Sequence, residues 1–184
     1  MGDVPQIAVK SVAAYIFGYL NLEADILSHL EDPAYAYDEK RLQYDAGTIL
    51  STLEPMPFND YFKIVCVLDA DLFVPIFTHV YGEAKQGGRY ALVSINRLKK
   101  NSDGSVVPLA LILERTAKIA LHELGHLFNL YHCMDERCLM FFLATLEDLD
   151  KTPFYFCRYC SAFLRDALQK QMTMADFAKV GKDP

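Results

Sequence analysis

The stretch His122-Glu123-Leu124-Gly125-His126 decides how the rest of the chain is interpreted. On an α-helix, two histidines four residues apart differ by only ~40° around the axis, so both imidazoles project from one face. Neutral imidazole is a good zinc ligand, and two from one rigid helix leave room for a third ligand from elsewhere. Glu123 is rotated by ~100° from His122, so it can reach a metal-bound water without being a ligand itself.

A third histidine follows this motif. His132 lies ten residues after His122, too far round the axis to share the same face of a helix that simply continued. We therefore expect a turn at about Asn129, because Asn is second only to Gly in tolerating the left-handed conformation that ends helices. The turn would bring His132 back to complete a catalytic zinc centre with an open position for water. The alternative is a helix with two solvated or core-satisfied histidines, and the third histidine at this offset disfavours it.

Four of the five cysteines cluster after the histidines. They run as C-x4-C-x-M and later C-x2-C, and comprise Cys133, Cys138, Cys157 and Cys160, with Met140 inside the set. Four thiolates would form a closed tetrahedral zinc site without a position for water, which makes that zinc structural. A reducing compartment disfavours the alternative of two disulfides, and the spacing disfavours buried free thiols. The remaining Cys66 lies in an apolar run, and we expect it to be a buried strand residue.

Together these residues resemble the metzincin clan of zinc peptidases, whose pattern is H-E-x-x-H-x-x-G-x-x-H, and within it the archaemetzincin family, which adds such a four-cysteine set. Two departures occur: Asn129 stands where the family usually has Gly, and the gap from Met140 to Cys157 is one residue shorter. Neither removes a ligand. The resemblance implies a metallopeptidase with two zinc ions, one catalytic and one structural. Glu123 would take a proton from the zinc-activated water, and Met140 would form a hydrophobic floor beneath the histidines.

The resemblance also implies the fold. It predicts a compact α/β (α+β) domain with a mixed twisted sheet, an active-site helix carrying the motif, and a zinc-stabilised C-terminal lobe. A length of 184 residues suits one such domain, divided into an N-terminal lobe, 1–129, and a C-terminal lobe, 130–184. Residues 77–84 would form the sheet edge above the zinc, where a peptide substrate adds as an antiparallel strand. The alternative is an edge strand with no such role.

In the first half of the chain we expect four elements from residue patterns. These are a helix over 5–19, a strand over 20–30, a helix over 38–53 capped by Asp38, and a central strand over 63–68 buried on both faces. Asp69 and Asp71 follow that strand, and two carboxylates in such a turn are more often caps than catalysts. His29 and His79 have no ligand-like neighbours and are not expected to bind metal.

In the second half we expect strands over 77–84 and 90–95, joined through Gly87-Gly88. Pro108 opens the long helix, to which Glu114, Arg115 and Lys118 should give a polar face. Ser161 should cap a closing helix with an apolar stripe, and the chain should fray after Val180. That stripe includes Phe163, Leu164 and Leu168.

The composition excludes some classes of protein. Apolar content of 52% and charged content of 23% are ordinary for a globular protein, while a net charge of -6 argues against nucleic acid as a partner. The apolar run from Val12 to Leu20 is too short to span a bilayer and makes a poor signal peptide. We therefore expect a soluble, cytoplasmic protein without a membrane partner. No oligomeric state is predicted.

The sequence is compatible with three functions. A zinc peptidase acting on peptides is the main hypothesis. A non-catalytic two-zinc scaffold for protein partners would not need Glu123 beside an open metal position. A nucleic-acid-binding zinc ribbon built on the cysteines is disfavoured by the acidic charge and by the lack of flanking Arg and Lys clusters. Because His132 and Cys133 are adjacent, we also expect loss of the cysteine site to misplace His132 and weaken the catalytic zinc.

Overall fold

The computed structural model describes residues 4–27, 30–101 and 103–180. Its helices are α1 (Gln6–Leu20), α2 (Ala46–Leu53), α3 (Leu109–Leu127), α4 (Leu146–Lys151) and α5 (Arg158–Val180), with short 3-10 turns at Ala34–Ala36 and Arg97–Lys99. Its strands are β1 (Tyr37–Asp38), β2 (Gln43–Asp45), β3 (Ile64–Leu68), β4 (Leu72–Val74), β5 (Phe77–Val80), β6 (Gly82–Ala84) and β7 (Tyr90–Ser94). The helix expected over 5–19 and the strand expected over 90–95 are therefore confirmed.

The strands form two mixed sheets. One has the order β1-β2-β4-β5 and the other the order β3-β7-β6. Each contains parallel and antiparallel neighbours. In the first sheet, β2 runs parallel to β4, and β5 runs antiparallel to β4. In the second, β3 runs parallel to β7, and β6 runs antiparallel to β7. The expected α/β class with a mixed sheet is confirmed, with the difference that the sheet is divided. The stretch 77–84, expected as one strand, changes sheets at Tyr81.

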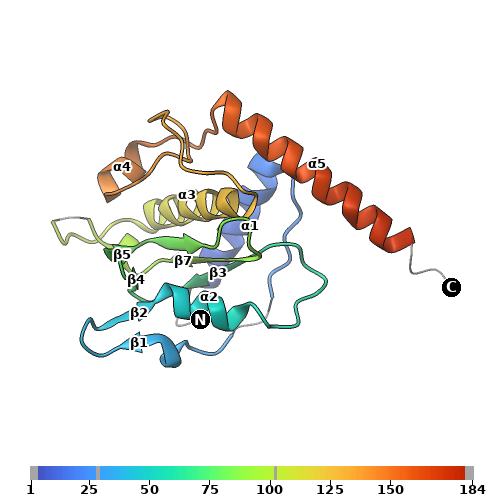
Figure 1. Ribbon diagram of the computed structural model, residues 1–184. Coiled ribbons are helices and arrows are strands. Elements are labelled where there is room, and N and C mark those ends of the chain that lie inside the picture. The colour runs from blue at the N-terminus through green and yellow to red at the C-terminus, as the bar shows by residue number, and fades with distance from the viewer. Residues whose placement is uncertain (1–3, 28–29, 102, 181–184) are drawn as a thin grey trace.

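The central strand β7 is buried on both faces. All five of its residues are buried, and they alternate between two cores because successive side chains of a strand point to opposite faces. Ala91 and Val93 pack in the cluster that α3 joins, whereas Tyr90 and Leu92 pack in the cluster beneath α2. The strand expected over 63–68 is confirmed as β3, and it packs in both clusters, with Val67 in the first and Cys66 and Leu68 in the second. Only its expected central position was wrong, since β3 stands at the end of its strand order. Figure 1 shows the sheet between α3 and α2, with α1 beside α3.

The helix α3 begins after Pro108 as expected, but the polar face predicted for it was wrong. Arg115 is 1% exposed and Lys118 is 2% exposed. Arg115 donates to both carboxylate oxygens of Asp150 at 2.7 and 2.6 Å, and Lys118 donates to Leu149 O at 3.0 Å. Buried charges persist where they are paired and hydrogen-bonded. Here the partners come from α4, an element that the sequence did not predict.

Two expectations for the first half of the chain were also wrong. No strand follows α1 in the described part of 20–30, because Asn21 adopts a left-handed φ of 52° and an irregular segment continues from it. His29 lies outside the described residues. Asp38 does not cap a helix: it lies in β1, and its carboxylate accepts the N–H groups of Lys40 and Arg41 in a turn. The cap of α2 is Asp45, which accepts the Thr48 N–H at 2.9 Å.

The closing helix starts earlier than expected. It begins at Arg158, so Ser161 lies within the first turn and donates to Phe156 O at 2.9 Å instead of acting as a cap. Leu164 is buried, but Phe163 is 70% exposed and does not belong to the packing stripe. The predicted fraying at 181–184 falls outside the described residues. Among the described residues, no helix is long and apolar enough to cross a membrane.

Candidate metal centre

The end of α3 is shaped by a left-handed residue at the expected place. Asn129 has a φ of 67°, its N–H donates to His126 O at 3.0 Å, and the Leu130 N–H donates to Gly125 O at 3.0 Å. This pair of bonds is the Schellman motif, which satisfies the last carbonyl groups of a helix. The chain consequently reverses direction directly after α3, and His132 returns towards the helix.

The three histidines meet in this turn. His122 Nε2 lies 3.1 Å from His126 Nε2 and 3.3 Å from His132 Nε2. The first two side chains are buried, and His132 is exposed. The three nitrogens therefore face one point that is closed by α3 on one side and reached from solvent on the other.

Backbone carbonyls fix which ring nitrogens carry protons. His122 Nδ1 lies 2.7 Å from Leu139 O, and His126 Nδ1 lies 2.8 Å from Leu130 O. A carbonyl oxygen can only accept, so both Nδ1 atoms donate and the Nε2 atoms carry free lone pairs. Burial, followed by the proximity of His126, lowers the pKa of His122 to about 3. Burial also lowers the pKa values of His126 and His132, so the rings are neutral at pH 7.

This arrangement fits a zinc ion. Lone pairs that face one another at 3.1 Å repel unless a cation lies between them. Tetrahedral zinc with Zn–N distances of ~2.05 Å requires ligand nitrogens about 3.3 Å apart, close to the spacing of the three Nε2 atoms. His122, His126 and His132 could therefore hold a zinc ion and leave a coordination position free.

Glu123 lies beside this group and is 7% exposed. Burial, and then the nearby Glu83 carboxylate, holds the pKa of Glu123 well above its usual value. Gly82 of β6 covers Glu123 so closely that a Cβ on Gly82 would lie 2.7 Å from both Cγ and Oε1 of Glu123. The carboxylate is thus confined between α3 and β6, in an environment that favours uptake of a proton.

Met140 packs against the helix that carries the histidine pair. It is fully buried, and its side chain packs against Gly125 of α3, where a Cβ would collide with the Met140 sulfur. The Cys133 N–H donates to Met140 O at 2.7 Å. The segment that carries His132 is therefore hydrogen-bonded to the segment beneath the histidines.

The four clustered cysteines form a second group. The sulfurs of Cys133, Cys138, Cys157 and Cys160 all lie within 4.8 Å of one another. All five cysteines lie in the described part of the chain, and all are free thiols. Cys133 Sγ and Cys157 Sγ are 3.7 Å apart, and tetrahedral zinc with Zn–S distances of ~2.3 Å requires about 3.8 Å. Cys66 is buried in β3, where burial raises its pKa to about 11, as expected of a structural cysteine.

Backbone amides support these sulfurs. The Cys157 N–H donates to Cys138 Sγ at 3.3 Å, and the Cys160 N–H donates to Cys157 Sγ at 3.5 Å. Burial raises the pKa of Cys160, and the neighbouring thiols raise it further. Four sulfurs this close together cannot all ionise without a cation, so the group suits a metal with thiolate ligands.

The comparisons with known proteins agree with this geometry. The chain matches the model of peptidase family M54 over residues 9–166. The chain belongs to peptidase family M54. It is 37% identical over 138 residues to the archaemetzincin of Methanopyrus kandleri, covering 75% of each chain. It is 31% identical over 163 residues to that of Halobacterium salinarum, covering 87% of this chain and 93% of the relative.

Solved structures of M54 relatives share the fold. The crystal structure of the Methanopyrus kandleri archaemetzincin matches with a TM-score of 0.82 and 33% identity, covering 92% of this chain and 91% of that chain. A zinc-dependent peptidase from Methanocorpusculum labreanum matches with a TM-score of 0.78 and 28% identity, covering 88% and 95%. The resemblance to archaemetzincins is thereby confirmed. The individual roles of Glu123 and the seven metal-ligand candidates remain predictions.

Sequence reasoning missed the residues that confine this M54 site. Gly82 falls within the strand expected over 77–84, where nothing in the sequence indicates its approach to Glu123. The carbonyls of Leu130 and Leu139 that orient the histidines carry no sequence signal either. Phe142 was also missed, although its ring lies 5.3 Å from that of His132. In the sequence, only the position of Phe142 two residues after Met140 indicates that it lies near the histidines.

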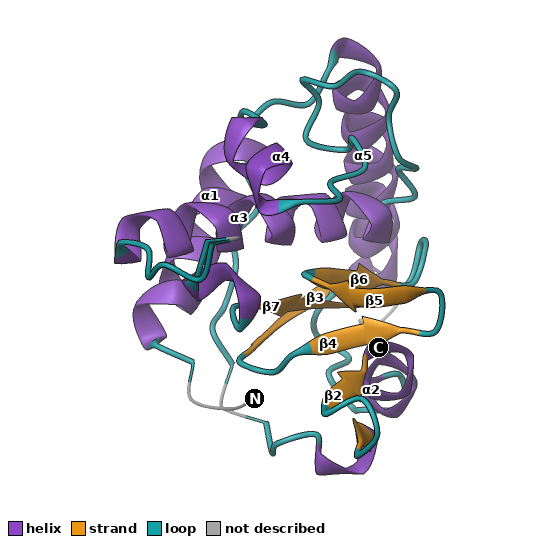
Figure 2. Ribbon diagram, turned by 90° about the vertical axis from the view of Figure 1, so that its left-hand side faces the viewer, coloured by secondary structure: helices purple, strands orange, loops and turns teal. Residues whose placement is uncertain are grey.

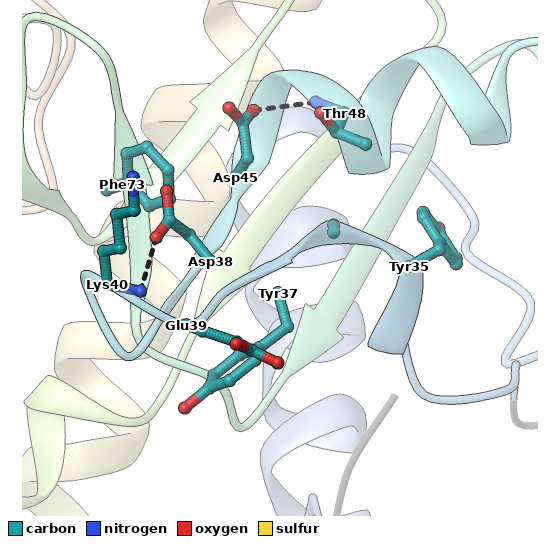
Figure 3. Close-up of a pocket in the computed structure, with 9 residues that line it drawn as sticks. Tyr35, Tyr37, Asp38, Glu39, Lys40, Asp45, Thr48 and Phe73 are labelled. Atoms are coloured by element: carbon teal, nitrogen blue, oxygen red, sulfur yellow. Dashed lines mark hydrogen bonds between the residues drawn. The ribbon is translucent and has the colours of Figure 1, made fainter.

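A separate hollow lies away from both cysteine and histidine groups (Figure 3). It has a volume of about 450 Å³, and Tyr35, Tyr37, Asp38, Asp45 and Phe73 are among its lining residues. Two of its carboxylates are already used within the chain: Asp38 accepts the Lys40 N–H, and Asp45 accepts the Thr48 N–H. None of the predicted metal ligands lines it, so it does not belong to the candidate centre.

Proposed function

We propose that this M54 peptidase hydrolyses peptide bonds at a zinc ion held by His122, His126 and His132, with Glu123 as its general base. One observation carries the proposal. Three imidazole Nε2 atoms converge beside the buried carboxylate of Glu123, and two of them are unprotonated because the Nδ1 atoms of His122 and His126 donate to backbone carbonyls. A scaffold would need the convergence of nitrogens but not the carboxylate, and no comparison favours the scaffold.

The residues divide the chemistry between them. Zinc bound at the histidines would acidify a water molecule and polarise the carbonyl group of a peptide. Glu123 would accept a proton from the attacking water as its oxygen bonds to the carbonyl carbon, and would deliver that proton to the amine as the C–N bond breaks. To take the proton Glu123 must be ionised, and a zinc ion beside it would oppose the rise in pKa that burial causes. Gly82 and α3 keep the carboxylate in place and restrict water around it.

The substrate would bind along the β5–β6 ribbon. β5 and β6 each stand at the end of their strand order, so each presents a free edge to which an extended peptide can add as an antiparallel strand. Gly82 of the same ribbon lies over Glu123. A peptide on this edge would therefore pass directly by the carboxylate. Figure 2 shows β6 next to α3, with β5 beside β6 on the side away from the helix.

We propose a second, structural zinc at Cys133, Cys138, Cys157 and Cys160. Supporting it are the 4.8 Å limit on all sulfur separations and the N–H groups aimed at two of the sulfurs. This metal would stabilise the lobe formed by residues 130–184. Free thiols that bind a metal persist in a reducing compartment, so we further propose a cytoplasmic location. The acidic charge continues to argue against nucleic acid as a partner.

Replacing Glu123 by Gln tests the assignment. The change preserves shape and removes the proton-accepting oxygen, and general acid–base catalysis contributes roughly 10²- to 10⁴-fold to rate. We expect hydrolysis of a peptide library to fall by that factor while zinc content and thermal stability persist. Glu54→Gln makes the same chemical change at an exposed site and should leave all three readings unaltered. Equal activity in Glu123→Gln and the wild type would exclude Glu123 as the base.

A further inference from the structure

Two aromatic rings connect the edge strand to the segment that follows the third histidine. The ring centroid of Phe77, the first residue of β5, lies 5.9 Å from that of Phe142, and Phe142 lies 5.3 Å from the ring of His132. Phe77 belongs to the sheet, whereas Phe142 belongs to the segment after Met140. The contact therefore spans from the proposed substrate edge to the segment that carries the third histidine.

Both rings come from backbone that is held in place. Phe77 O accepts a hydrogen bond from the Arg41 guanidinium at 3.2 Å, and Phe77 pairs with Val74 across the β4–β5 hairpin. Next to Phe142, Phe141 forms a bridge to Cys133, and its N–H donates to Cys138 O at 2.8 Å. Neither ring belongs to a core, since Phe77 is 42% and Phe142 is 44% exposed. The contact is a surface contact between anchored segments.

The direction of a bound peptide places this contact on one side of the scissile bond. The ribbon runs from Phe77 to Ala84, so an antiparallel peptide runs the other way, with its C-terminal part towards Phe77. Gly82 marks the position of Glu123 along the ribbon. Residues that follow the scissile bond, which leave with the amine, therefore pass His132 and reach the Phe77–Phe142 pair.

We propose that Phe77 and Phe142 form an aromatic barrier across the leaving-group side of the substrate edge, which makes the enzyme favour peptides with few residues after the scissile bond. The inference rests on the proposed function, because it takes the position of the peptide from that site. A short leaving segment ends before the rings. A longer leaving segment must separate the two rings. The contact between such rings contributes a factor of about 2 to 10 to an equilibrium constant, so the longer peptide should bind less well by about that factor.

A set of peptides that differ only in length after the scissile bond tests the barrier. We would measure kcat/KM for a one-residue leaving segment and for a long one in the wild-type zinc enzyme, Phe77→Ala and Phe142→Ala. The ratio of kcat/KM for the short peptide to kcat/KM for the long one should fall by about 2- to 10-fold in both variants, because only the long peptide must pass the rings. Phe142→Tyr retains the ring, and Ile76→Ala removes an adjacent side chain that is 83% exposed. Both should keep the wild-type ratio.

A binding measurement separates this inference from the proposed function. Fluorescently labelled peptides of the two lengths would be titrated into Glu123→Gln, with and without Phe142→Ala. If the wild type hydrolyses no peptide but the length preference in binding disappears with the ring, the proposed function fails and the barrier stands. The barrier is overturned if the wild type shows no length preference, or if removing either ring slows short and long peptides equally.

Discussion

Replacing Gly82 by Ala should disable catalysis without touching a metal ligand. A Cβ at this position would lie 2.7 Å from Cγ and Oε1 of Glu123 and 2.8 Å from Cγ2 of Ile119. Carbon atoms in van der Waals contact are about 3.5–4.0 Å apart. The new methyl group therefore overlaps its neighbours by roughly 1 Å. Ile119 is part of α3, so the easier movement is displacement of the Glu123 side chain.

The structure sets the size of both effects. Overpacking of a well-packed site typically destabilises by about 1–3 kcal/mol, which the fold should tolerate. A misplacement of ~1 Å in a catalytic group can lower the rate by about 100-fold. We therefore expect kcat/KM to fall by about two orders of magnitude, while zinc bound at the histidines is retained because their rings do not contact Gly82 in this way.

Gly18→Ala is the matched control for Gly82→Ala in these measurements. Gly18 lies in α1 with nothing within 4 Å of a built Cβ, so the same substitution there should leave activity unchanged and stabilise the helix by about 0.5–1 kcal/mol. Zinc content, thermal midpoint and kcat/KM would be measured for each protein. Full activity of Gly82→Ala with wild-type zinc content would refute the claim that β6 fixes the position of Glu123.

Two further predictions follow from the packing around the metal groups. Cys133→Ser should weaken zinc binding at the histidines, because Cys133 neighbours His132 and supplies one of the four sulfurs that would hold this segment in place. Undiminished histidine-site affinity in a zinc titration would contradict this coupling. Asp150→Ala should lower the free energy of unfolding in urea by about 2–3 kcal/mol, whereas breaking a fully buried pair costs ~3–5 kcal/mol. The smaller value is expected because the Asp150 side chain is 33% exposed and because Arg115 keeps its hydrogen bond to Leu98 O at 3.1 Å. Glu54→Ala, which breaks the exposed pair with Lys85, is the control and should change stability by less than about 1 kcal/mol; equal effects in the two variants would refute the role of the buried pair.

The metal groups could be anticipated because their geometry is local. His122 and His126 share a helix face by their spacing, and Asn129 can adopt the left-handed conformation that returns His132. The cysteines likewise come from two short clusters. Their meeting across the intervening segment was suggested by the family pattern and not by local spacing alone.

What could not be anticipated depends on contacts between distant segments. Arg115 has the sequence character of a surface residue, and only its pairing with Asp150 makes burial tolerable. Asp38 and Asp45 are equally good helix caps by residue type. The pairing of β1 with β2, through Tyr37 with Tyr44, occupies the first and leaves the second to begin α2. The approach of Gly82 to Glu123 likewise arises from the packing of β6 on α3.

Metal content per chain tests the central claim most directly. Elemental analysis would be carried out on protein purified without added metal, for the wild type and His126→Ala. The account predicts two zinc ions per chain in the wild type and one in His126→Ala, because the cysteine group remains intact. A single zinc ion that survives His126→Ala, with no second ion restored by added zinc, would contradict it. Only the cysteine site would then bind metal.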